Sequence, residues 1–110
     1  MTGLNLGTLI SDMTAAVKAA TEEDWNKLTG HIEEEVLKLS RLAVRIEAQH
    51  LAGQITDAEA RALLKGAKIA SRIALRSAAG VQKVIAEKAI NAATGILAGA
   101  VNTALGFTLL

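Results

Sequence analysis

Two carboxylate–imidazole pairs are the residues of this chain whose types and spacing suit chemistry. Glu47 precedes His50 by three residues, and His31 precedes Glu34 by three. On a helix this spacing places both side chains of a pair on one face, where they can share a metal ion. The nearest other acids on the same segment lie about 20 Å from Glu47 along a helix axis. A complete site at Glu47 and His50 therefore needs ligands from a second copy of the chain.

The run Glu47-Ala-Gln-His50 resembles half of the di-iron motif of ferritin-like bundles. The resemblance covers four residues and implies a metal-binding bundle as a third hypothesis for function. The alternative is structural: His50 ends an apolar row near a turn, and Glu47 pairs with an arginine. No cysteine is present, and none of the serines has a base at helical spacing, so we expect no catalysis and no cofactor.

The composition favours packed helices. Hydrophobic residues make up 51% of the 110 residues, but aromatics only 2%, so the apolar mass is Ala, Leu, Ile and Val. Proline, which breaks helix interiors, is absent. The net charge of +1 gives no global argument for a polyanionic partner. These features predict an all-α fold in a single domain.

Turn signals divide this domain into segments. Residues 1–20 have helical apolar spacing and form an N-terminal helix that either ends near Ala20 or continues into the first arm, 21–52. Thr21 is typical of an N-cap at that junction. Gly53 in the 53–56 turn suits a helix C-terminus, and Thr56 with Glu59 forms a capping box. A long second arm then covers 57–106, with a possible bend or break near Gly80. The prediction is a long antiparallel helical hairpin, whose arms span roughly 68 Å each if both are continuous for about 45 residues. Such a hairpin buries its faces by oligomerisation, with a folded-back N-terminal helix, or in lipid.

Two rows of residues define the expected seams of this hairpin. Large residues recur at helical spacing on the first arm, and small residues on the second, so we expect large to pack against small. The interface is expected to contain, on the first arm, Trp25, Ile32, Val36, Leu39 and Ile46, and on the second arm Gly66, Ile69, Ile73, Gly80, Val84, Gly95 and Gly99.

Charge is divided between the two halves. Residues 1–60 contain five basic and ten acidic residues, net −5, whereas residues 61–110 contain seven basic and one acidic, net +6. Most of the basic residues stand one position before a residue of the second seam. Folding at Gly53 brings the two blocks together, which favours the antiparallel register. The expected pairs join Glu33, Glu34 and Glu35 to Arg72 and Arg76. Lys83 and Lys88 are expected near Glu22, Glu23 and Asp24. Nucleic-acid binding is not indicated, because no aromatic residue interleaves the basic row.

The two ends of the chain are poor in charge. No charged residue follows Lys88, and residues 89–110 are long enough to span a bilayer, with Gly95 and Gly99 forming a GxxxG motif. The predicted register puts residues 1–20 beside residues 87–106. No positive charge follows Met1 and no apolar run is unbroken, so a secretory signal is not indicated. We expect a cytoplasmic or membrane-associated protein.

These observations predict a non-enzymatic structural or interaction protein that self-assembles through its seams into a homo-oligomer. The alternative is a membrane-associating or membrane-inserting protein that uses residues 1–20 and 89–110, with lipid as the partner of its apolar end.

Overall fold

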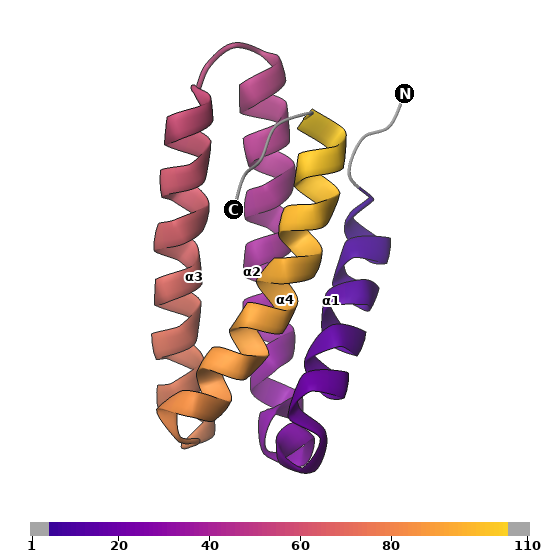
Figure 1. Ribbon diagram of the computed structural model, residues 1–110, viewed down its shortest axis with the longest axis vertical. Coiled ribbons are helices and arrows are strands. Elements are labelled where there is room, and N and C mark those ends of the chain that lie inside the picture. Colours follow the sequence, from indigo (N-terminus) through magenta and orange to yellow (C-terminus); the bar gives the residue numbers. More distant parts are fainter. Residues whose placement is uncertain (1–4, 106–110) are drawn as a thin grey trace.

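The computed structural model describes residues 5–105, and the side chains of residues 5–104, in an all-α fold (Figure 1). The elements are α1 (Leu6–Thr21), a 3₁₀ turn η1 (Glu22–Asp24), α2 (Trp25–Leu51), α3 (Asp57–Ala79) and α4 (Lys83–Leu105). No strand occurs between residues 5 and 105.

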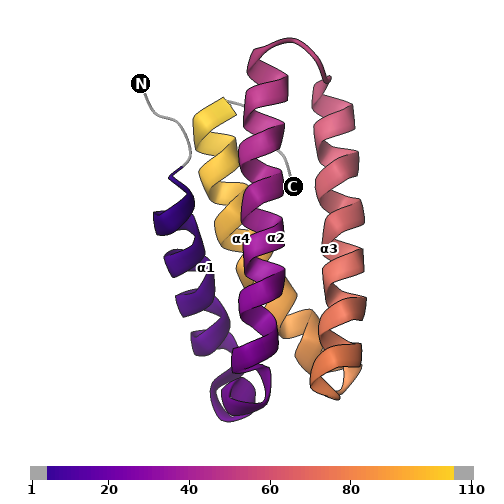
Figure 2. The ribbon, with the colours of Figure 1, turned by 180° about the vertical axis from the view of Figure 1, so that it is seen from behind.

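Each helix runs antiparallel to the one before it, and α4 crosses the front of the α2–α3 pair to lie beside α1 (Figures 1 and 2). α2 and α4 occupy opposite faces, with α3 and α1 at the two edges. The longest dimension is 41 Å, close to the length of about 40 Å expected for the 27 residues of α2.

The break between α1 and α2 shows that the N-terminal helix is not continuous with the first arm. Glu22 has a positive φ of 38°, which stops α1, and η1 turns the chain back. Thr21 stands at the N-cap position of η1, as the sequence predicts, but its side chain makes no capping hydrogen bond there. It is buried as the last residue of α1, and its hydroxyl donates to the carbonyl oxygen of Val17. Asn5 caps the start of α1 by accepting from the Thr8 N–H.

The turn between α2 and α3 has the predicted chemistry. Gly53 adopts a positive φ of 72° just beyond α2, where a residue with a Cβ is disfavoured. The Thr56 hydroxyl accepts from the Glu59 N–H, and the Glu59 carboxylate accepts from the Thr56 N–H. This capping box satisfies donors at the start of α3 that have no partner within the helix.

The second arm is not one long helix, so the prediction of arms of roughly 68 Å is wrong. α3 ends at Gly80, which has a φ of 66° and donates its N–H to the Arg76 carbonyl oxygen. Near Gly80, where the sequence analysis placed a possible break, the chain reverses direction. This reversal lets the apolar face of α4 fold back over the other helices instead of extending beyond them.

The predicted row of the first arm lies in the core, whereas the predicted row of the second arm does not. Ile32, Val36, Leu39 and Ile46 are buried, and Trp25 packs half-buried at their end. On α3 and α4 the buried hydrophobic residues are Ala60, Leu64, Leu75, Ala86, Ala89, Ile90, Ala93, Leu97, Ala98 and Val101.

The predicted second seam instead lies on the outside. Ile69, Ile73 and Val84 are 41%, 62% and 55% exposed. The four seam glycines, Gly66, Gly80, Gly95 and Gly99, are exposed as well. The physical reason is that α3 has a second row at helical spacing, Leu64 and Leu75 with Ser71 between them, and this is the row that packs into the core formed with α2 and α4.

The charge-poor segments are side by side, as predicted. α1 and α4 form the most extensive helix pair, with Leu9, Met13 and Val17 of α1 buried. They do not form the end of a hairpin, because α4 crosses the bundle diagonally from the end of α3 to the side of α1 (Figure 1). Residues 1–4 and 106–110 of the predicted apolar segments lie outside the described residues.

Candidate interaction surface on α3

The Glu47 and His50 pair sits at the turn end of α2. His50 Nε2 lies 2.6 Å from Asp57 Oδ1, at the start of α3, so its first carboxylate partner comes from across the turn. Glu47 is buried. The side chain of His31 is exposed on α2. Within the described residues, no group of three or more His, Asp or Glu side chains is arranged to hold a metal ion. The imidazole therefore has a structural partner that fastens α2 to α3.

Among the described residues, Glu33, Glu34 and Glu35 form no ion pair with Arg72 or Arg76, contrary to the prediction. Glu34 and Glu35 both lie near Lys38 of their own helix, at 3.6 and 3.4 Å. Arg72 pairs instead with Glu87 of α4 at 3.8 Å, and Lys83 reaches the same carboxylate at 3.8 Å.

The register behind that prediction is nevertheless right. Glu35 and Ser71 line one shallow groove between α2 and α3, as folding at Gly53 requires. The charged side chains diverge because Lys38 lies one turn from Glu34 and Glu35, a nearer partner than any residue of α3.

An apolar row runs along the face of α3 that points away from the core. We call Ala62, Gly66, Ile69, Ile73 and Ser77 the outer stripe; all five are exposed. A Cβ added at Gly66 would meet no heavy atom within 4 Å. The outer stripe therefore has no partner within the described chain, and an interior glycine that usually weakens a helix serves no close packing there.

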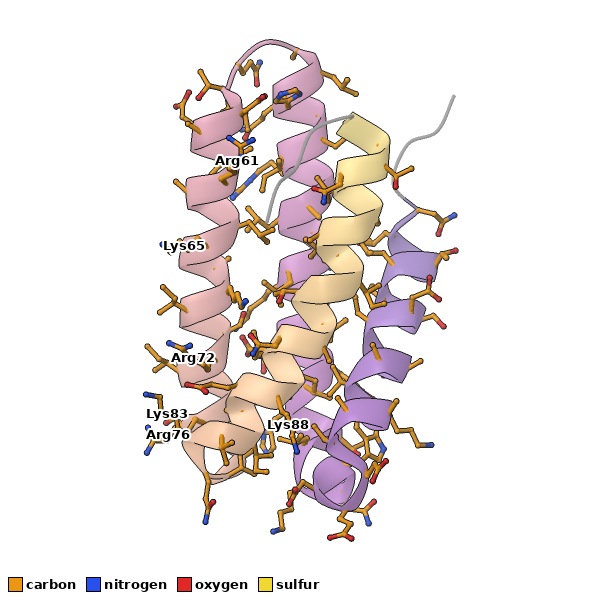
Figure 3. All side chains as sticks on the ribbon, in the orientation of Figure 1. Arg61, Lys65, Arg72, Arg76, Lys83 and Lys88 are labelled. Carbon is orange, nitrogen blue, oxygen red and sulfur yellow. The ribbon has the colours of Figure 1, made fainter. Side chains whose placement is uncertain are left out.

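A row of cations runs beside this stripe. We call Arg61, Lys65, Lys68, Arg72 and Arg76 the basic band; each stands one position before a stripe residue. In Figure 3, Lys65, Arg72 and Arg76 follow the edge of α3, with Lys83 close to Arg76. Lys65, Lys68 and Arg76 have no ion pair with any side chain that the structure describes.

The opposite side of the stripe carries no charge. Ala67, Ala70 and Ala74 lie there and line the groove shared with Leu39 of α2. α3 is therefore apolar outside, cationic on the side toward α4 and alanine-rich on the side toward α2. Sequence reasoning found both rows but assigned them to contacts within the chain. The signal for an outside surface was the absence of any acid from Ala60 to Ala86.

The apolar end also has a defined place. α4 carries the one stretch of the described chain, Lys83–Ala104, that is long and apolar enough to cross a membrane by length and composition, with a mean hydropathy of 1.3. Within the 18 residues of this stretch that have that hydropathy, 44% are buried inside the bundle. Its buried face packs against α1, α2 and α3.

Comparison of the chain with known protein families, with curated proteins and with solved structures finds no match.

Proposed function

We propose that the chain is a non-enzymatic interaction protein that self-assembles by antiparallel packing of the α3 outer stripe against the same stripe of a second copy. The observation that carries this proposal is the exposed apolar row on α3, with Ile73 62% exposed and open space above Gly66. The sequence predicted that large residues pack against small ones between the two arms of one chain. In this proposal the same kind of packing occurs between two copies of the chain.

The stripe is self-complementary in one antiparallel register. A two-fold axis that passes between positions 69 and 70 sets Ile73 of one protomer opposite Gly66 of the other, and the reverse by symmetry. The same axis sets Ala62 opposite Ser77. Each isoleucine then packs over a position without a side chain, which lets the two helix backbones approach closely.

Self-assembly through the first-arm seam is no longer needed. That seam is buried within one chain by the folding back of α1 and α4. The outer stripe is a short surface, about 23 Å from Ala62 to Ser77. An interface of this length belongs to the small, reversible class rather than to obligate oligomers.

Membrane association through residues 1–20 and 89–110 is the second candidate function. The observation that favours it is the length and hydropathy of the α4 stretch. It requires the apolar face of α4 to leave α1 and α2. Protein that is recovered only as heterogeneous aggregate without detergent, and becomes discrete with detergent, would replace self-assembly with this function.

The test of self-assembly compares two substitutions at equally exposed positions. Ile73→Ser lies in the stripe, and Leu51→Ser, at the end of α2, is the matched control because Leu51 is 63% exposed. In sedimentation velocity over a range of concentrations, the wild-type chain and the control are expected to approach twice 11.4 kDa. Ile73→Ser is expected to stay a monomer. Equal association of all three proteins would reject the stripe as the interface.

A further inference from the structure

An antiparallel pairing of the outer stripes has a geometric consequence for the basic bands. A two-fold axis perpendicular to both helices leaves features on the front of one helix on the front of its mate. The band lies on the α4 side of α3, as the Arg72–Glu87 pair shows. Both basic bands therefore meet on one face of the dimer, together with both copies of α4.

Within the basic band, Lys65 and Arg76 lie nearest the outer stripe around the helix, so Lys65 of one protomer and Arg76 of the other come nearest the interface. In the register set by Ile73 and Gly66 they are two residues out of alignment, an axial offset of about 3 Å. Symmetry repeats this pair about 17 Å away along the helices, so the dimer presents a cluster of four cations in two pairs on one face. α3 has no acid from Ala60 onward, and Glu87 is shared between Arg72 and Lys83. The cluster therefore favours an external anion.

The surroundings of the cluster specify the chemistry of that anion. α4 lies on the same face and carries no charge from Ala89 to Leu105, with Ile96 37% and Val84 55% exposed. α3 and α4 contain no aromatic residue on which a nucleobase can stack. Cations flanked by uncharged, partly apolar helix surface fit lipid headgroups and the adjoining acyl region.

We propose that Lys65 and Arg76 from two copies form a docking site for the phosphate groups of an anionic membrane surface. This inference rests on the proposed self-assembly, because one copy supplies only half of the cluster. The bundle stays folded on the membrane, so the site differs from insertion of residues 89–110.

The experiment is cosedimentation with vesicles of phosphatidylcholine alone and of phosphatidylcholine mixed with phosphatidylglycerol. The wild-type chain is expected to bind only the mixed vesicles. Lys65→Gln/Arg76→Gln removes four cations from the dimer and is expected to partition about 600-fold less, since each cation near an anionic surface contributes about fivefold. Arg41→Gln/Arg45→Gln removes the same charge from exposed positions of α2 and is expected to bind as the wild type does.

The outcomes separate the membrane site from self-assembly. Equal losses in the two double variants would show that net charge alone drives binding and would overturn the site. Tighter binding to a duplex DNA oligonucleotide than to the mixed vesicles would also overturn it. Sedimentation velocity without vesicles tests self-assembly separately: a dimer that ignores mixed vesicles refutes only the membrane site. Ile73→Ser that binds vesicles as the wild type does would show that the partner copy contributes nothing.

Discussion

A substitution at Gly66 is expected to stabilise the monomer and to weaken the proposed dimer. In the monomer Gly66 is an exposed interior residue of α3, with nothing within 4 Å of an added Cβ. Gly66→Leu should therefore stabilise the isolated bundle by about 0.8 kcal/mol through helix propensity. For a chain of this size that raises the Tm by about 3–4 °C.

The same substitution should weaken the dimer. A leucine at this position meets Ile73 of the other protomer, and overpacking costs about 1–3 kcal/mol at each of two symmetric contacts. The sum of about 2–6 kcal/mol lowers the association constant at least 30-fold.

The assay pairs thermal unfolding by circular dichroism, at a concentration where the wild-type chain is monomeric, with sedimentation equilibrium at higher concentration. Gly95→Leu on α4 is the control, because Gly95 is also exposed, with open space around it, but lies outside the stripe. It should raise the Tm equally and leave association unchanged. Undiminished association of Gly66→Leu would refute the register, and a lowered monomer Tm would refute the open surface.

Two further predictions concern the fold. Gly80→Ala should destabilise the monomer by about 1 kcal/mol because φ is 66° there, although no neighbour crowds the site; urea unfolding that leaves the midpoint unchanged would contradict the left-handed cap. Leu97→Ala should cost about 2–5 kcal/mol, because it empties a fully buried site on α4, whereas a loss under 1 kcal/mol would mean that α4 does not pack on the bundle.

Some of the fold was readable from the sequence because local chemistry determines it. Gly53 needs a positive φ, and Thr56 with Glu59 satisfies helix N–H groups, so the turn between α2 and α3 follows from its own residues. The first-arm row was also readable, since Ile32, Val36 and the residues aligned with them form the longest apolar row at helical spacing on that segment.

The break at Gly80 and the buried face of α3 depend on packing between distant segments. Gly66 and Gly80 look alike in the sequence, but one continues a helix and the other ends it. α3 has two rows at helical spacing, and periodicity does not tell which row faces the core. Preference for small residues selected the row with Ile73, whereas the row with Leu64 is the one that is buried.

The candidate surface was partly predictable for the same reason. The sequence defined the stripe and the basic residues beside it, but it matched Arg76 to the acidic block of the first arm. Competition from Lys38, one turn from Glu34 and Glu35, decides where those carboxylates go. Which cation each carboxylate reaches depends on side-chain geometry. The net charge of each half of the chain does not give that information.

Antiparallel pairing of α3 is tested most directly by disulfide cross-linking, because the chain has no native cysteine. Position 69 lies next to the proposed two-fold axis, whereas the two copies of position 62 lie about 22 Å apart along the direction of the helices. Under mild oxidation Ile69→Cys is predicted to give a covalent dimer and Ala62→Cys to remain a monomer. Cross-linking of Ala62→Cys as readily as Ile69→Cys, or of neither, would contradict antiparallel assembly through α3.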